Sequence, residues 1–413
     1  MVQYFDVIVV GARCAGATLA IRLGNAGHRV LLLDQGNFPS DTLSTHAIFN
    51  NTVWELKDLG IFPLIPELDA PPVRNVLLQF EDVKIEGSLP PIKGEEDSYC
   101  IRRSYLDQAA IQKASEIPNV TIYTKVRVKD LLWDEDRVVG VKTKDALGQQ
   151  QEYHSKWVVG ADGRNSTVRK KLKLKPLIDV PTDFACYFTY IEGLEAKSEP
   201  TFEVYRIYDR TLVIFPTNHH QHVVFVAFPL ANRLWIKEFG HNSKSALWDF
   251  LKTQFVEIKF NNRLHNAKIV EKIRGLTGFS NHWFSGIGKG WALVGDAVIF
   301  KDPALAQGIH DAIYAGKILQ PILEKAMQTD EIDETQLDRL YQEQLQAKFR
   351  ERFELGIALT KNNLMSAEQK LFQQTISQYP EAVEKFLGFY NYANNMDAVT
   401  QIVRSIIEQA QIK

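Results

Sequence analysis

The stretch VIVVGARCAGATLA, residues 7–20, decides the fold of this chain. A hydrophobic run typical of a strand enters Gly11, and Gly16 follows five residues later. The spacing is that of the dinucleotide-binding fingerprint G-x-G-x-x-G, except that Arg13 stands where the fingerprint has its middle glycine. Because that glycine lets the backbone approach a pyrophosphate, the stretch is either a broken motif or a variant that still binds a dinucleotide.

The surrounding sequence has the strand–helix–strand order that the fingerprint requires. YFDVIVV (4–10) is a short β-branched run of the kind buried in parallel sheets, and residues 14–25 place small and apolar side chains at helical spacing. HRVLLLD (28–34) predicts a second strand that ends in Asp34, 23 residues after Gly11. A carboxylate there can accept hydrogen bonds from an adenosine ribose.

Arg13 removes only one function of the turn. Gly11 still allows the tight turn, Gly16 allows close helix–strand packing, and the helix N-terminus offers free N–H groups to a phosphate. An arginine beside a pyrophosphate can replace the lost backbone contact with a charge-assisted one. The alternative is a plain βαβ unit that binds no ligand.

Two distant stretches favour the interpretation that this unit binds a dinucleotide. WVVGADGRNSTVRKKL (157–172) and GWALVGDAVIFKDPALAQGIHDAIYAGKIL (290–319) each predict a buried strand followed at once by an aspartate, Asp162 and Asp296. Ligands of open α/β sheets bind at the carboxyl ends of the strands, where these carboxylates would lie. The helix that starts near Ile309 points its N-terminal amides at the same crevice.

Composition limits the remaining possibilities. The 413 residues are enough for two or three domains, and 48 basic against 50 acidic residues give a net charge of −2 without a basic stripe for nucleic acid. No apolar run approaches the ~20 residues of a membrane span. Three scattered cysteines give neither a disulfide framework nor a C-x-x-C metal pair, so a reducing cytoplasm is expected. The histidines of NHHQH (218–222) lack an acidic or cysteine partner nearby, so no metal is predicted.

Together the three motifs resemble the FAD-dependent aromatic hydroxylases, the single-component flavoprotein monooxygenases of the p-hydroxybenzoate hydroxylase type. These proteins have a full or degenerate G-x-G-x-x-G, a middle D-G motif and a late G-D motif in this order. GARCAG (11–16) followed by DTLSTH (41–46) is similar to a subgroup in which arginine routinely replaces the middle glycine. The resemblance covers most of residues 1–320 and favours the variant over the broken motif.

The resemblance implies roles for individual positions. FAD would be held by Gly11, Arg13, Cys14, Ala15, Gly16, Asp34, Gln35, Thr45, His46, Arg103, Val126, Asp162, Gly163, Gly295, Asp296, Pro303, Ala306, Gln307, Gly308 and Ile309. His46 and Pro303, beside the flavin ring, are the candidate catalytic residues. The late motif departs from the family pattern, with Ile299 for a histidine, Ala306 for a glycine, His310 for an asparagine and Ala315 for an aspartate.

The domain organisation expected is α/β with an inserted sheet. Residues 1–72, 96–178 and 281–332 would form a Rossmann-like FAD-binding domain of the glutathione-reductase type, and residues 73–95 and 179–280 an antiparallel β-sheet substrate domain. Residues 333–413 would be a helical C-terminal region. Candidate substrate-contacting residues on the sheet are Tyr187, Tyr205, Phe215 and Phe225.

The function expected from the resemblance is an FAD-dependent, NAD(P)H-using monooxygenase. It would insert one oxygen atom from O2 into an aromatic or polycyclic small molecule through a flavin hydroperoxide, as a monomer or homodimer. One alternative is a reductase of the geranylgeranyl reductase type. A flavin-dependent halogenase is less favoured because the chain lacks W-x-W-x-I-P. A flavin-free scaffold is disfavoured because packing alone would not demand Asp34, Asp162 and Asp296.

Overall fold

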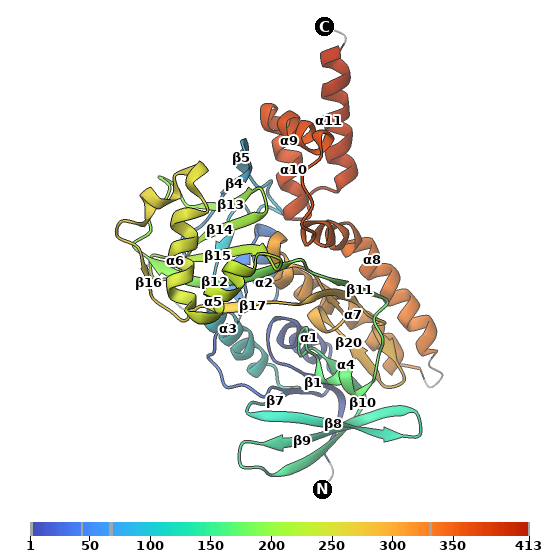
Figure 1. Cartoon of the computed structure of the whole chain (residues 1–413). Helices are drawn as coiled ribbons and strands as arrows, with labels where there is room; N and C mark the ends of the chain where they lie inside the picture. The colour runs from blue at the N-terminus through green and yellow to red at the C-terminus, as the bar shows by residue number, and fades with distance from the viewer. Residues whose placement is uncertain (1–2, 43, 66–68, 330–332, 412–413) are drawn as a thin grey trace.

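The computed structural model describes residues 3–42, 44–65, 69–329 and 333–411. Its largest α/β unit is built on an eight-stranded sheet with the order β19-β20-β10-β1-β2-β7, to which β8 and β9 are joined through β10 (Figure 1). The strands are β1 (Gln3–Val10), β2 (Val30–Leu33), β7 (Val120–Tyr123), β8 (Val126–Asp134), β9 (Arg137–Asp145), β10 (Gln150–Gly160), β19 (Ile287–Gly288) and β20 (Trp291–Leu293).

The central strands are parallel and end in register. Val10 pairs with Leu33 on one side and with Gly160 on the other, and Gly160 pairs with Leu293. Residues 7–9 and 30–33 are completely buried, which explains the uninterrupted β-branched and leucine runs. Because four strands end at one level, the loops after them meet at a single edge of the sheet.

Helices pack together beside this sheet. α1 packs against both α3 and α7, and its small residues allow the close approach. The helices of this unit are α1 (Cys14–Asn25), α2 (Asn50–Asp58), α3 (Arg103–Ser115), α4 (Thr167–Lys171) and α7 (Gly308–Met327). The short helical turns are η1 (Phe62–Leu64), η4 (Gly295–Ala297) and η5 (Pro303–Leu305).

A second sheet lies beside the first and has eight strands in the order β16-β12-β15-β14-β13-β4-β5, with β17 paired to β12 (Figure 1). Its strands are β4 (Asn75–Phe80), β5 (Val83–Ser88), β12 (Phe184–Glu192), β13 (Thr201–Ile207), β14 (Arg210–Thr217), β15 (Gln221–Pro229), β16 (Lys268–Ile269) and β17 (Arg274–Leu276). One face packs on α5 (Arg233–His241) and α6 (Ser243–Thr253), near η2 (Val256–Ile258) and η3 (Phe260–Leu264). The other face contributes to a separate core.

Two small sheets connect these layers. One has the order β11-β18-β21, formed by β11 (Ile178–Pro181), β18 (Ser280–Trp283) and β21 (Ile299–Phe300). The other pairs β3 (Ala47–Ile48) with β6 (Tyr99–Cys100).

The last part of the described chain is helical. It consists of α8 (Glu334–Leu359), α9 (Ala367–Gln378), α10 (Pro380–Tyr390) and α11 (Met396–Gln411). α8 runs along α7 and β19, whereas α9 and α10 contact β5, so this region bridges both sheets. Figure 1 shows α9–α11 gathered at one end of the molecule. The predicted fold class, a Rossmann-like unit with an antiparallel sheet and a helical C-terminal region, is confirmed, except that one pair of the second sheet, β4 with β13, is parallel.

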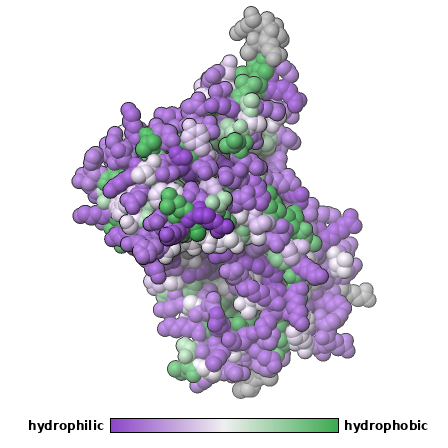
Figure 2. All heavy atoms as spheres, viewed as in Figure 1, coloured by the Kyte–Doolittle hydropathy of each residue, from purple (hydrophilic) through white to green (hydrophobic). Residues whose placement is uncertain are grey.

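The outer surface is mainly polar. Figure 2 shows a mostly hydrophilic face on which hydrophobic residues occur in small, separate groups. Within the part of the chain that the structure describes, every helix is too short or too polar to cross a membrane.

Candidate FAD and substrate site

A cavity of about 600 Å³ lies at the edge where the parallel strands end. Its walls come from the loops after β1, β2, β10 and β20, from the start of α7, and from β12 and β15 of the antiparallel sheet. Sixteen of the twenty positions predicted to hold FAD line it: Gly11, Arg13, Cys14, Ala15, Asp34, Gln35, Thr45, Arg103, Val126, Asp162, Gly163, Asp296, Pro303, Ala306, Gly308 and Ile309. The four that do not are Gly16, His46, Gly295 and Gln307.

The turn after β1 depends on its two glycines. Gly11 has φ +105°, and a Cβ there would lie 2.5 Å from the Ala161 carbonyl oxygen. A Cβ on Gly16 would lie 1.7 Å from the Gly11 carbonyl oxygen. Gly16 therefore serves helix–strand packing and does not reach the cavity. No side chain caps the start of α1, so its first N–H groups remain available to a ligand.

Asp34 closes the turn from the neighbouring strand. Its Oδ2 accepts a hydrogen bond from the Ala12 amide at 2.8 Å, and its Oδ1 accepts one from the Gly36 amide at 2.6 Å. Each carboxylate oxygen keeps a further lone pair. The side chain is thus held rigidly at the cavity with acceptor capacity to spare, as a ribose contact requires.

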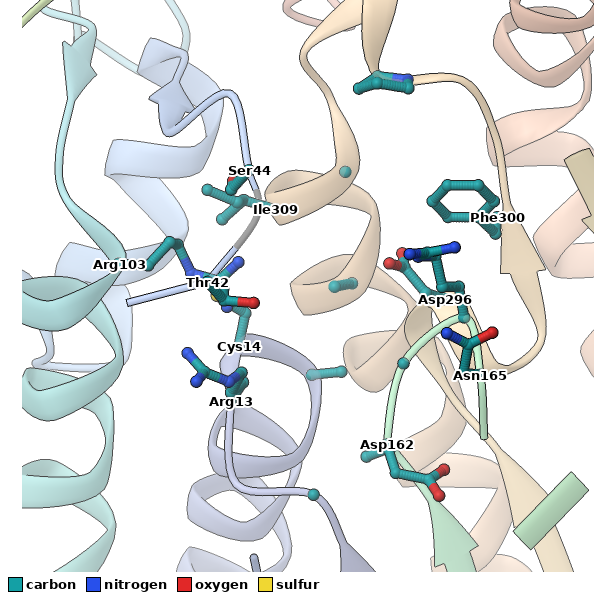
Figure 3. A pocket seen from close by; sticks show the side chains of 18 of the residues that line it. Arg13, Cys14, Thr42, Ser44, Arg103, Asp162, Asn165, Asp296, Phe300 and Ile309 are labelled. Atoms are coloured by element: carbon teal, nitrogen blue, oxygen red, sulfur yellow. The ribbon is translucent and has the colours of Figure 1, made fainter. Parts of the chain in front are cut away.

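Arg13 and Arg103 meet on a carboxylate that the sequence analysis did not single out. Asp107 Oδ1 accepts hydrogen bonds from Arg103 Nε at 3.1 Å and Nη2 at 2.8 Å, and Asp107 Oδ2 is paired with Arg13 Nη1. Arg13 Nη2 also donates to Ser40 Oγ at 3.0 Å. Figure 3 shows Arg13 and Cys14 on the turn that opens α1, with Arg103 approaching from α3.

Across the cavity from Arg103 lie Asp162 and Asp296 (Figure 3). Asp162 Oδ2 accepts a hydrogen bond from the Thr167 amide at 2.6 Å, whereas its buried Oδ1 has no partner among the described residues. Burial raises the pKa of Asp162, and burial also raises the pKa of Asp296 to about 6. Two desolvated carboxylates with unused acceptor atoms suit a ligand rich in hydroxyl donors.

The start of α7 forms the far wall. A Cβ on Gly308 would meet no atom within 4 Å, so the helix offers open space beside its N-terminal amides. Ala306 has φ +53°, the left-handed conformation that explains a glycine at this position in the resembling family. Gln307 points its side chain away from the cavity, donating to the Tyr390 carbonyl at 2.9 Å and accepting from Lys301 Nζ at 2.9 Å. Only its backbone can face a ligand.

These features fit FAD. The turn at Gly11 and the N-termini of two helices suit a diphosphate, Asp34 suits a ribose, and the unpaired carboxylate atoms of Asp162 and Asp296 suit a polyol chain. The open space at Gly308 suits a flat ring. The individual contacts remain predictions.

The predicted substrate residues divide between the two faces of the antiparallel sheet. Tyr187 and Tyr205 belong to the face under α5 and α6, and Tyr187 stacks on Phe239 with ring centroids 4.1 Å apart. Tyr187 still borders the cavity, whereas Tyr205 does not. Phe215 and Phe225 belong to the other face, but only Phe225 lines the cavity, since Phe215 packs on Phe202.

Residues that the sequence analysis missed complete the apolar wall. They are Cys186, Phe188, Leu276, Ile299 and Phe300. Phe188 is the cross-strand partner of Phe225, so the period-2 pattern would have found it once the inward face was known. Lys301, Asp302 and Asp311 are further charged residues at this end of the cavity.

His46 is completely buried and does not line the cavity. Its Nε2 lies 2.7 Å from the Tyr190 hydroxyl, which donates to Asp41 Oδ2 at 2.8 Å, and its ring packs edge-on against Phe188. Nδ1 has no partner among the described residues. Burial lowers the pKa of His46 to about 3, so the ring is neutral at ordinary pH. This arrangement gives His46 no direct contact with a substrate in the cavity.

Comparison with known proteins places the chain in a family. The family model described as an FAD binding domain matches residues 4–344, so the chain belongs to that family. It is therefore an FAD-dependent oxidoreductase, a class that the fold and the cavity also fit.

Three similar proteins have different activities. The chain is 28% identical over 362 residues to a digeranylgeranylglycerophospholipid reductase of Methanosarcina acetivorans, covering 83% of this chain and 80% of that protein. It is 31% identical over 183 residues to squalene epoxidase 1 of Arabidopsis thaliana, covering 43% and 34%. The solved structure of the flavin-dependent brominase Bmp2 superposes with a TM-score of 0.82 at 20% identity, over 99% of both chains.

Proposed function

We propose that the protein is an NAD(P)H-using monooxygenase that inserts one oxygen atom of O2 into an apolar aromatic or polycyclic small molecule. The observation that carries this proposal is the composition of the cavity. One continuous space is lined both by the residues suited to FAD and by an apolar wall of Phe188, Phe225 and Leu276. An apolar wall of this kind can orient an apolar substrate and keep water from a reactive oxygen species beside it.

FAD would supply the redox chemistry, taking two electrons from the nicotinamide and activating O2. One oxygen atom would enter the substrate, the other would leave as water, and NAD(P)H would become NAD(P)+. The chain's own residues bind the dinucleotide, orient the substrate and exclude water. We assign the substrate to the antiparallel sheet, whose inner face carries Phe188 and Phe225.

Two alternatives have specific support. The similarity to a reductase that acts on geranylgeranyl chains favours hydride transfer to a double bond, for which an apolar wall is equally suitable. The superposition with a brominase favours halide oxidation. The similarity to a squalene epoxidase favours oxygen insertion, although it spans less than half of this chain.

The test is anaerobic reduction of the FAD-loaded protein by NADH or NADPH, followed by mixing with ¹⁸O2 and a panel of aromatic and polyisoprenoid compounds. Mass spectrometry identifies the reaction. One ¹⁸O atom in the product supports the monooxygenase. Two added hydrogens without oxygen support the reductase, and a product that forms only with bromide or chloride supports a halogenase. Either of the last two outcomes overturns the proposal.

A matched pair of variants tests the substrate wall. Phe225→Leu changes a residue that lines the cavity, and Phe228→Leu makes the same change on the same strand toward α6. We expect Phe225→Leu to change the preference among the panel compounds while Phe228→Leu leaves it as in the wild type. Equal effects of the two variants would contradict the assignment of the inner face.

A further inference from the structure

Arg13, Arg103 and Asp107 form a compact charge cluster directly behind the turn that opens α1. Asp107 is completely buried, and its two oxygens are divided between the arginines: Oδ1 pairs with Arg103 and Oδ2 with Arg13. Cys14 Sγ lies 3.4 Å from Oδ1. Arg13 and Arg103 line the cavity, whereas Asp107 does not.

The cluster leaves donors free on the cavity side. Arg103 uses Nε and Nη2 for Asp107, and Arg13 uses Nη1 and Nη2 for Asp107 and Ser40. A guanidinium has five N–H donors. Among the described residues, Arg103 Nη1 and Arg13 Nε have no hydrogen-bond partner, and neither atom is buried without one. Because both residues line the cavity, a ligand there can approach these groups.

The charges also favour an anion. Two arginines cannot share a partly buried site without a counter-ion, because like charges at short range repel strongly where the dielectric constant is low. One carboxylate neutralises half of their charge and leaves one net positive charge. That charge lies beside the N-terminus of α1, where the helix dipole also presents positive charge to a ligand.

We propose that Asp107 is a positioning residue for the diphosphate of FAD. It acts through the arginines: its carboxylate fixes Arg13 and Arg103 so that their free N–H groups face the phosphate oxygens. The cluster thereby replaces the backbone contact that the missing glycine at position 13 would have made. Arg13 works in this turn because Asp107, 94 residues away in the sequence, holds its side chain clear of the space above the turn.

The proposal rests on FAD binding and not on the reaction. The probe is therefore ADP, which carries the diphosphate and the adenosine but no flavin ring. Its dissociation constant is measured by calorimetry at low and high salt, next to that of FAD. If the protein proved not to be a monooxygenase, its affinity for ADP would be the same. The two proposals can therefore fail separately.

Positioning and simple charge neutralisation predict opposite results for Asp107→Asn. If Asp107 only neutralised charge, its removal would raise the positive potential and tighten ADP binding. We expect instead that ADP and FAD bind at least about tenfold more weakly, equivalent to about 1.4 kcal/mol. Unchanged or tighter ADP binding would overturn the proposal.

Asp338→Asn is the matched control. Asp338 accepts hydrogen bonds from Ser285 Oγ at 2.6 Å and from the Gly286 and Ile287 amides at 2.8 and 3.0 Å, and it does not line the cavity. This variant should lose thermal stability but keep the wild-type affinity for ADP. Weaker ADP binding in the control would show that the loss of affinity comes from destabilisation of the whole protein. That result would overturn the proposal.

Arg13→Gln keeps the proposal testable if Asp107→Asn does not fold. Arg103 and Asp107 remain paired in this variant, and the Arg13 side chain is 29% exposed, so the fold should survive. We expect weaker ADP binding with a smaller salt dependence. If Asp107→Asn does fold, its further cost to ADP binding in the double variant should be smaller than in the wild type, because residues that act together are not additive. Full additivity, or no effect of Arg13→Gln on ADP binding, would refute the link.

Discussion

The ammonium group of Lys301 lies 2.6 Å from the Asp311 carboxylate, in an ion pair at the wall of the cavity. Asp311 also accepts a hydrogen bond from the Tyr392 hydroxyl at 2.5 Å. Although burial opposes ionisation, Lys301 and His310 hold the pKa of Asp311 below its usual range. The pair therefore ties the loop before Pro303 to the C-terminal helical region.

Asp311→Asn should destabilise the protein by about 3 kcal/mol or more, because it leaves a buried ammonium without its counter-ion. Urea unfolding measures the loss. Glu343→Gln is the control: Glu343 pairs with Arg339 at 3.0 Å on the exposed face of α8, and breaking it should cost less than about 0.5 kcal/mol. Similar losses in both variants would show that Lys301 is not buried as described.

The sequence predicted the parts of the site that follow from strand ends. Buried parallel runs end in Gly11, Asp34, Asp162 and Asp296, and parallel strands in register bring such ends to one edge. Asp107 escaped notice because its link to Arg13 is a contact between the starts of two helices. An aspartate four residues after Arg103 reads as an ordinary helical ion pair.

The residues of the substrate wall could not be predicted from the sequence for a different reason. Alternation identifies two faces of a strand but not which face is inward. Tyr205 was therefore named as a candidate although it lies on the face under α5 and α6, and Phe188 was missed. Phe215 shows a second limit, since it shares the inner face of the sheet but packs on Phe202 away from the cavity.

The pH dependence of stability should reveal Asp296 and Asp302. Burial raises the pKa of each to about 6, from a usual value of 3.8. The folded state therefore holds these protons more tightly than the unfolded chain does. Their contribution to stability is complete below pH 4 and is lost as the pH rises through 6, by at most about 3 kcal/mol for each group.

Asp296→Asn should flatten this part of the stability curve, measured by urea unfolding between pH 4 and 7. Saturating FAD should flatten the wild-type curve too, because hydroxyl donors to the Asp296 carboxylate would lower its pKa. If stability depended on pH in the same way in the wild type and in Asp296→Asn, the buried environment of Asp296 would be contradicted.

Gly308, at the cavity wall, and Gly16, which packs α1 on the turn behind it, should respond in opposite ways. Gly308→Val adds side-chain atoms where a Cβ meets open space, so the protein should fold with nearly unchanged thermal stability but bind FAD much more weakly. Gly16→Ala puts a Cβ 1.7 Å from a carbonyl oxygen and should disrupt folding itself. Thermal unfolding and retained flavin absorbance separate the two effects. Full flavin retention by Gly308→Val would remove α7 from the flavin site.

The contribution of His46 to stability should depend on pH in the opposite direction. Burial lowers its pKa to about 3, whereas an unfolded histidine titrates near 6.5. Its stabilising contribution is complete above about pH 6.5 and is lost as the pH falls toward 3, with about 2 kcal/mol lost between pH 7 and 5. His46→Gln should remove that loss, while His241→Gln on the surface should not.

The same variants test the predicted catalytic role of His46. A neutral ring behind Phe188 can act on the reaction only through the position of its neighbours, including Tyr190 and Asp41. We therefore expect His46→Gln to leave the rate of flavin reduction within about twofold of the wild type at pH 7, as a group outside the reacting atoms should. A loss of 10²-fold or more, the scale of a missing general acid or base, would return His46 to the catalytic residues and would require its ring to reach the cavity.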